Sequence, residues 1–203
     1  MNSNIFKIYS LSLAMLTGGL ISNASVLDNV DTTIGGISHI CVPTFQMVHR
    51  PNAMLRFNVN RFAGLQEYTI SSFPLCLSSH RAQQMFAILP FDENPKGTYG
   101  KHYYDAEYAK PYRYDVYLND SNATLAFAPA ERGGIFEFVH ENEKSSKKGF
   151  TISTAYGTLT AENNIIKGYD VVRGARNYKR CPERDIKLWI YGEAENAIFS
   201  SDA

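Results

Sequence analysis

Tyrosine is concentrated in one stretch of the chain, and its side chain is well suited to binding. Seven of the 13 tyrosines lie in residues 99–118. A tyrosine ring combines apolar area with a hydroxyl group, so exposed tyrosines bind sugars, peptides and membrane interfaces. Around Tyr103, Tyr104 and Tyr108 the neighbours include His102 and acidic residues, which interrupt the alternation expected of a sheet core. We therefore predict that Tyr103, Tyr104 and Tyr108 contact a binding partner.

Three short polar motifs follow one another in the second half of the chain. Their residues are Arg113, Ser153, Thr154, Glu193 and Glu195. In this order they resemble the Arg, Ser-Thr-Ser and Glu-x-Glu elements of ADP-ribosylating toxins, with Ala155 in place of the second serine. The resemblance implies an NAD-using transferase, in which the arginine holds the cofactor's phosphates and the serine–threonine pair braces the cleft. It also implies that the second glutamate stabilises the charge that develops as the nicotinamide bond breaks, while the first activates the acceptor.

Other catalytic and metal-binding patterns do not occur in the sequence. The five histidines are scattered, and neither His102 nor His140 has the helical His/Glu spacing of a hydrolytic zinc site. There is no Cys-x-x-Cys pair, no glycine-rich phosphate loop and no Gly-x-Ser-x-Gly elbow. Apart from the NAD that the resemblance implies, we therefore expect neither a metal nor a cofactor.

The first 24 residues, Met1 to Ala24, have the layout of a secretory signal peptide. Lys7 precedes an apolar run, and small residues at its end supply a cleavage site. The run is too short and too interrupted for a membrane-spanning helix, which needs about 20 apolar residues. We therefore expect the mature chain to begin at Ser25, to lie in a secreted or extracytoplasmic location and to have no membrane span. Residues 25–203 have the length of a single domain.

The three cysteines, Cys41, Cys76 and Cys181, all lie in the expected mature region. In an oxidising compartment two of them should form a disulfide bond and one should remain. Cys181 lies in a long basic segment without apolar anchors, so it gains most from a covalent link, and Cys76 is the expected partner. Closing a loop of about 100 residues contributes roughly 4–5 kcal/mol in the chain-entropy model. Cys41 lies in the most apolar of the three segments and is expected to be a buried thiol.

Short alternating segments separated by turn residues predict a mainly β fold. Apolar residues alternate with polar ones at residues 55–59, 112–118 and 186–191, and turn signals at Asn119–Asn122 and Arg132–Gly134 separate further candidate strands. In residues 112–118 the alternation places Tyr112 on the same face as the apolar residues that follow it. We expect an antiparallel sandwich or barrel with one or two short helices, or alternatively an α+β fold.

One helix and one late strand are also predicted. The helix covers His80 to Leu89, because two serines precede it as caps, glutamine and methionine favour helix, and Pro90 would end it. A last short strand is predicted at Ala197 to Phe199. The sequence shows no internal repeat and no linker that divides the mature region.

Two kinds of covalent modification are suggested by local sequence. Asn119 and Asn122 each begin a glycosylation sequon in a predicted surface turn, so both are candidate sites in a eukaryotic secretory pathway. Lys179-Arg180 is a dibasic pair in a predicted loop and is a candidate processing site.

Composition and export together favour a binding function. The chain has 20 basic and 20 acidic residues and no net charge, so nothing indicates a nucleic-acid partner. Export without recognisable catalytic machinery, and the surplus of tyrosine, predict a secreted non-catalytic binding protein of the adhesin, toxin-subunit or effector type used in virulence. Its partner would be an extracellular protein or a glycan. The alternative is a secreted ADP-ribosyltransferase-like toxin that uses NAD.

Overall fold

The structure, a computed structural model, describes residues 26–35, 46–61, 68–77, 84–95, 97–172 and 185–200. The chain divides into two compact units, residues 1–30 and 31–203. In the described part of the first unit, Val26–Asn29 form a short 3-10 helix, η1. Cys41, Cys181, the Lys179-Arg180 pair and the predicted signal peptide lie outside the described residues, so the predictions made for them remain predictions.

The second unit is built mainly from strands. They are β1 (Gln46–Val48), β2 (Phe57–Val59), β3 (Thr69–Ile70), β4 (Phe73–Leu77), β5 (Gln84–Asp92), β6 (His102–Lys110), β7 (Arg113–Leu118), β8 (Ala123–Pro129), β9 (Gly134–His140), β10 (Lys148–Ser153), β11 (Thr158–Glu162), β12 (Ile165–Val172) and β13 (Ile186–Glu193). A 3-10 turn, η2 (Asn119–Ser121), connects β7 to β8. No α-helix occurs in the part of the chain that the structure describes. The predicted mainly β class is therefore confirmed over the α+β alternative.

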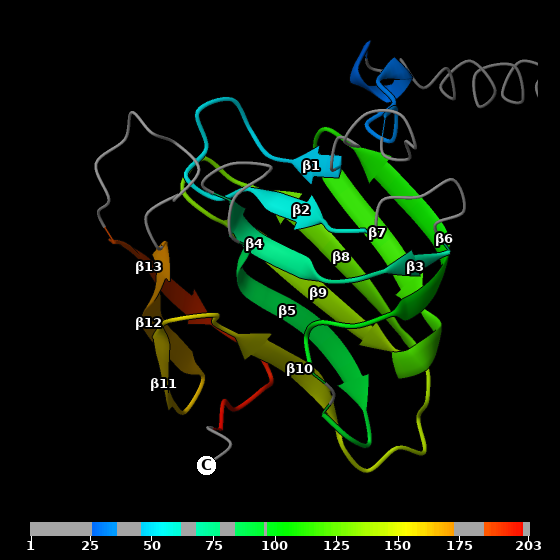
Figure 1. Ribbon diagram of the computed structural model, residues 1–203. Helices are drawn as coiled ribbons and strands as arrows, with labels where there is room; N and C mark the ends of the chain where they lie inside the picture. Colours follow the sequence, from blue (N-terminus) through cyan, green and yellow to red (C-terminus); the bar gives the residue numbers. More distant parts are fainter. Residues whose placement is uncertain are drawn as a thin grey trace, which may run out of the picture. The chain divides into compact units, whose positions relative to one another are not determined.

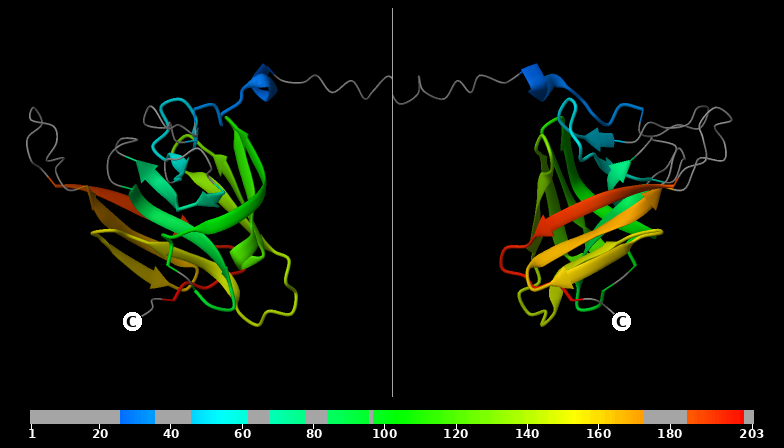
Figure 2. Two further views of the ribbon diagram at one scale, coloured as in Figure 1. Left: turned by 45° about the vertical axis from the view of Figure 1, so that its right-hand side comes forward. Right: turned by 90° about the vertical axis from the view of Figure 1, so that its left-hand side faces the viewer.

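Two antiparallel sheets form the principal layers of this unit. The first has the strand order β3-β6-β7-β8-β9, and the second has the order β10-β5-β4. Strands β1 and β2 form a short additional pair. Figure 1 shows β4, β5 and β10 in front of β6–β9, and the views in Figure 2 show them as separate layers. This arrangement is that of a β-sandwich.

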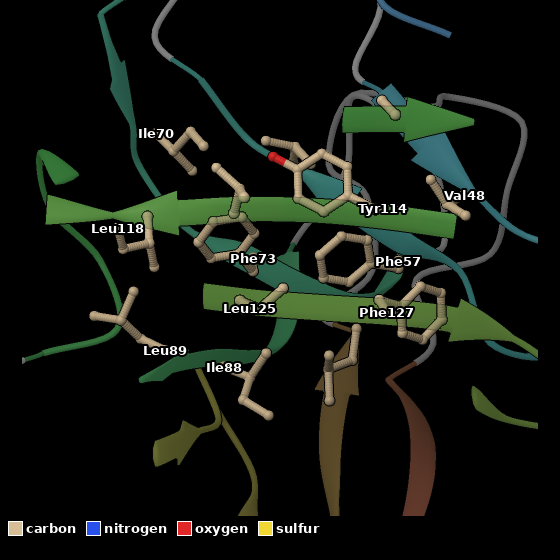
Figure 3. Packing of buried hydrophobic residues seen from close by; sticks show 14 of the residues in the cluster. Val48, Phe57, Ile70, Phe73, Ile88, Leu89, Tyr114, Leu118, Leu125 and Phe127 are labelled. Carbon is tan, nitrogen blue, oxygen red and sulfur yellow. The ribbon is translucent and has the colours of Figure 1, made fainter. Parts of the chain in front are cut away.

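The hydrophobic core lies between these two sheets. Its buried positions on β7 alternate as the sequence predicts and are Tyr114, Val116 and Leu118. Figure 3 shows Tyr114 and Leu118 among side chains from β2, β4, β5 and β8, and Val116 belongs to the same buried cluster. The rings of Phe57 and Phe127 stack there with centroids 4.7 Å apart. Tyr112 was expected on the same buried face, but it lies in the turn before β7 and is 40% exposed.

The helix predicted over His80 to Leu89 is wrong from residue 84 onward, where the described chain forms strand β5. This strand is central in its sheet, paired with β4 on one edge and with β10 on the other. Residues 85–90 are all buried, so the strand carries apolar residues on both faces. A short continuous apolar run of this kind suits a fully buried strand, and packing overrides the helix propensity of methionine and glutamine.

The late strand predicted at Ala197 to Phe199 is also wrong. These residues have no regular secondary structure in the described chain. The backbone N–H of Phe199 nevertheless donates a hydrogen bond to the Asn163 carbonyl at 2.7 Å. One such bond holds the segment against the turn between β11 and β12 without extending a sheet.

The last three strands form a further sheet with the order β11-β12-β13. The turn between β11 and β12 contains Asn163 at φ 54°, a left-handed conformation that asparagine tolerates. Gly168 allows close pairing, because a Cβ there would lie 2.1 Å from the Thr158 carbonyl oxygen. The side chains that pack this sheet against the core are Leu159, Val172, Leu188 and Ile190. Packing of one face leaves the other face of the sheet to solvent.

Candidate functional site

The outer face of the β11-β12-β13 sheet carries the largest exposed aromatic side chain of the protein. Trp189, the only tryptophan in the chain, is 72% exposed. It is paired across the ladder with Tyr169, while Tyr191 is paired with Lys167. Because directly paired residues project to the same side of a sheet, Tyr169, Trp189 and Tyr191 share one surface. We call these three residues the aromatic face.

Each ring of the aromatic face contacts a neighbouring side chain. The ring centroids of Tyr169 and Trp189 are 5.1 Å apart with a 54° tilt between the planes. The Lys187 Nζ lies 4.4 Å from the centroid of the Tyr169 ring, within the range of a cation–π interaction. Tyr191 donates a hydrogen bond to the Glu193 carboxylate, and this bond raises the pKa of Tyr191. These contacts leave Trp189 and Tyr191 well exposed, at 72% and 60%.

The margin of the aromatic face is polar and balanced in charge. By the register of the ladder, the polar side chains on this side of the sheet are Thr158, Thr160, Glu162, Lys167, Lys187 and Glu193. Two lysines and two glutamates cancel, so the surface suits an uncharged ligand with many hydroxyl groups better than a strongly charged one. Clusters of exposed aromatic residues on a rigid surface mark interaction sites in soluble proteins.

A buried carboxylate holds the loop that leads into this sheet. Asp170 on β12 is fully buried, and its oxygens accept backbone N–H bonds from Ala155, Tyr156 and Val171 at 2.8–3.0 Å. A buried carboxylate is tolerated because these donors replace water. Asp170 thereby ties Ala155 and Tyr156 to β12, which supports the strand pairing beneath the aromatic face.

A second concave surface adjoins the same sheet. It is an open groove of about 1280 Å³, bordered by β10, by β11 and the β11–β12 turn, and by residues 194–200. Phe150 projects from β10 and is met edge-on by Phe199, with ring centroids 5.5 Å apart. Hydroxyl, amide and carboxylate side chains also line it, so the groove offers both apolar and hydrogen-bonding contacts.

The structure brings together part of the motif that resembles ADP-ribosylating toxins. Ser153, Thr154 and Glu195 all line the groove. Glu193 lies instead on the outer side of β13, where Tyr191 donates to it. The fifth motif residue, Arg113, is not among the described residues that line the groove.

That remaining residue, Arg113, lies at the start of β7 and is engaged elsewhere. Its Nε and Nη2 donate to the two carboxylate oxygens of Asp115, each at 2.6 Å. The guanidinium is about half exposed, so it lies at the protein surface. The five motif residues therefore do not form one site in this structure, and their catalytic roles remain a prediction.

The three tyrosines predicted to bind a partner lie on two different sides of their sheet. Tyr103 and Tyr108 are exposed, whereas Tyr104 packs against the core and accepts a 2.7 Å hydrogen bond from Arg61 Nη1. The ladder shifts register between Asp105 and Tyr108, and Ala106 has φ 49°. This β-bulge breaks the simple alternation of side chains.

The same bulge directs Glu107 inward to a polar cluster. Glu107 pairs with Arg61 and accepts a 2.8 Å hydrogen bond from the Tyr114 hydroxyl. Burial raises the pKa of Tyr114 well above its usual value, and the adjacent Glu107 carboxylate adds to this effect. Arg61 also donates to Gln46 at 3.3 Å. The pairing of opposite charges and the hydrogen bonds indicate a structural role for this cluster.

A smaller polar cluster borders a small cavity of about 10 Å³, which has room for one water molecule. His102 Nδ1 lies 3.6 Å from the Asp120 carboxylate, and Ser121 also lines the cavity. The cavity is too small to admit a substrate. Within the described ranges, no group of three or more histidine, cysteine, aspartate or glutamate residues is arranged to hold a metal ion.

The structure describes some of the residues for which covalent modification was predicted. Asn119 and Asn122 are exposed, and their amide groups donate to Asp105 at 3.0 Å and to Asp92 at 3.4 Å. Exposure is compatible with glycosylation, which remains a prediction. Cys76 lies on β4 opposite Met85, but its predicted partner Cys181 is outside the described residues, so the disulfide bond also remains a prediction.

Comparison with known proteins identifies a shared fold and no family. No protein-family model matches the chain. No curated protein matches it significantly either. Among solved structures, a family GH92 alpha-mannosidase from Bacteroides thetaiotaomicron matches with a TM-score of 0.60 and 19% identity, over 79% of this chain and 25% of that one. The same enzyme in complex with mannoimidazole matches with a TM-score of 0.57 and 20% identity, over 79% and 24%.

These matches establish the β-sandwich-like fold alone, because the identity is low. The chain spans about a quarter of the length of the solved mannosidase chains. Among the described residues, no helix has the length and apolar character needed to cross a membrane.

Sequence reasoning identified the strand that carries Trp189 but not the site. The alternation predicted one buried side of β13, formed by three apolar residues. Two of them, Leu188 and Ile190, do pack against the core, whereas Ile186 at the end of the strand is exposed. The signal for the site was present on the opposite side, where Trp189 and Tyr191 take positions normally given to polar residues. What the sequence did not supply was the pairing with β12, which adds Tyr169.

Proposed function

We propose that this protein is a secreted, non-catalytic binding protein and that its ligand is a glycan held on the aromatic face. The observation that carries the proposal is the exposure of Trp189, the only tryptophan, beside Tyr169 and Tyr191 on one sheet surface. The exposed indole ring keeps a large apolar area in contact with water, which a bound ligand would cover, and tryptophan and tyrosine are enriched among the residues that dominate binding energy.

The chemistry of the aromatic face favours a sugar over other partners. A pyranose ring presents a C–H face that packs on an aromatic ring and hydroxyl groups at its edge that need hydrogen-bond partners. Threonines on β11 and the Lys167 and Glu193 side chains surround the rings and supply such partners. The charge balance at the margin suits a neutral glycan, and it gives no attraction to an anionic membrane surface.

The solved neighbours suggest which glycans to test first. Both are structures of an alpha-mannosidase, and one is a complex with mannoimidazole. We therefore propose mannose-containing glycans as the first ligand class. Since the chain spans about a quarter of those enzymes, the proposal concerns binding and does not assign their hydrolytic activity to this protein.

The experiment is binding of the purified chain to a glycan array that includes mannans and other neutral polysaccharides. Three proteins are compared: wild type, Trp189→Ala and Tyr103→Ala. We expect Trp189→Ala to weaken binding by about tenfold or more, the range typical of a central tryptophan. Tyr103→Ala removes an exposed tyrosine from another sheet and should leave the affinity unchanged.

This pair of variants also separates the two surfaces considered for binding. If Tyr103→Ala abolished glycan binding while Trp189→Ala preserved it, the ligand would lie on the tyrosine-rich β6 and the aromatic face would not be the site. If wild type bound no glycan on the array, the proposal of glycan binding would be rejected.

A further inference from the structure

We propose that the groove beside β10 binds an extended peptide segment, which adds to the free edge of this strand. Strand β10 pairs with β5 over all six of its residues, from Lys148 opposite Asp92 to Ser153 opposite Ala87. In the described part of the chain, no strand pairs with its other edge. The inference concerns a site separate from the aromatic face and does not depend on the glycan proposal.

The backbone of β10 supplies the chemistry that selects the ligand. In an antiparallel strand, alternate residues direct their N–H and C=O groups to opposite edges, so an edge strand presents a row of donors and acceptors. Every residue from Lys148 to Thr154 lines the groove, which therefore follows the whole strand. A repeating row of donors and acceptors is matched by another extended polypeptide, the basis of recognition by strand addition.

The composition of β10 does nothing to block such pairing. Natural edge strands are usually protected by proline, by inward-pointing charge or by a bulge. Strand β10 has no proline, its one charge is Lys148 at the end, and its ladder with β5 has no register shift. Phe150, Thr151 and Ile152 in its centre favour extended structure.

The far wall of the groove provides room and contacts for side chains. Residues 194–200 run along it without regular secondary structure, bound to the β11–β12 turn through Ala194 N–H to Asn164 O and Phe199 N–H to Asn163 O. The volume of about 1280 Å³ accommodates a segment of several residues. Lys148 and Glu195 are its only charged lining residues among those described, so the expected ligand is an uncharged segment with alternating apolar side chains.

The probe is a phage-displayed library of random ten-residue peptides, selected on the full chain. The best peptide is then synthesised in three forms: unmodified, N-methylated at odd positions, and N-methylated at even positions. N-methylation removes the amide donor and leaves the side chains in place. Strand addition predicts that one methylation register weakens binding at least tenfold, since each lost backbone hydrogen bond costs about that factor, while the other changes affinity by less than about twofold.

Amide hydrogen exchange locates the site. Binding of the unmodified peptide should slow exchange in residues 148–154 and leave residues 186–193 unchanged. The variant Trp189→Ala should bind the peptide as wild type does, which separates this site from the aromatic face. Failure to select any peptide, equal effects of the two methylation registers, or unchanged exchange in residues 148–154 would each overturn the proposal.

Discussion

The backbone N–H of Tyr156, in the loop before β11, donates a hydrogen bond to Asp170 Oδ1 on β12 at 2.8 Å. The same carboxylate accepts from Ala155 and Val171, so one buried side chain fixes the loop before β11 and the strand β12 together. The geometry of the aromatic face depends on these two strands, because Tyr169 lies beside Asp170 in the sequence and projects to the opposite side of the sheet.

Replacing Asp170 should therefore weaken the C-terminal sheet. In Asp170→Ala, three backbone donors lose their acceptor in a buried site, and we expect a loss of about 2–4 kcal/mol in the free energy of unfolding. Chemical denaturation measures this loss. Asp115→Ala, which removes a carboxylate that pairs with Arg113 near the surface, is the control and should change stability by less than about 1 kcal/mol.

Stability should fall at high pH because of Tyr114. Burial and the Glu107 carboxylate raise the pKa of Tyr114 in the folded state. The contribution of this tyrosine to the free energy of unfolding is therefore fully present below the unfolded pKa of about 10, and it is lost as the pH rises towards the folded pKa. Tyr114→Phe should reduce stability at pH 8, where the hydrogen bond to Glu107 is lost, and should show a smaller further loss between pH 10 and 11. Equal alkaline slopes for variant and wild type would show that Tyr114 titrates normally in the folded state.

The transferase alternative predicts an activity that the glycan proposal does not. With labelled NAD and host-cell lysate, we expect neither nicotinamide release nor labelled product, because Arg113 is bound to Asp115 and lies outside the groove that holds Glu195. Wild type and Glu195→Ala should be equally inactive. Activity in wild type that disappears in Glu195→Ala would establish the transferase and remove the basis for a non-catalytic protein.

The disulfide prediction is decided by peptide mapping under non-reducing conditions. We expect one bridged peptide pair that contains Cys76 and Cys181, with Cys41 recovered as a thiol after unfolding and alkylation. Because the bridge closes a long loop, its reduction should cost about 4–5 kcal/mol in the chain-entropy model. A bridge between Cys41 and Cys76, with Cys181 alkylated, would contradict the assignment.

The sequence was informative where local pattern and final environment agree. Alternation in β7 and β13 predicted their buried sides, and the turn signals at Asn119–Asn122 and Arg132–Gly134 located the β7–β8 and β8–β9 connections. It failed at β5, where residues 85–90 are buried on both faces and show no alternation that would distinguish strand from helix. Local pattern also cannot reveal a bulge such as that at Ala106, which places Tyr104 and Glu107 inside.

The candidate sites were harder to predict because they depend on strand order. Trp189 and Tyr169 are 20 positions apart in the sequence and become neighbours only through the β12–β13 ladder. The groove likewise requires β10, the β11–β12 turn and the segment after β13 to meet. The pairing of distant strands depends on packing of the whole core. Patterns within single segments of the sequence therefore do not predict these surfaces.

The central claim is tested most directly by the fluorescence of Trp189, because it is the only tryptophan in the protein and lies within the proposed site. The full chain is titrated with a soluble mannan, and the emission of Trp189 is followed together with an independent measure of binding by calorimetry. We predict a saturable blue shift, as the indole ring leaves water, with a midpoint equal to the calorimetric dissociation constant. Binding detected by calorimetry with an unchanged emission spectrum would contradict the account, since the glycan would then be held away from the aromatic face.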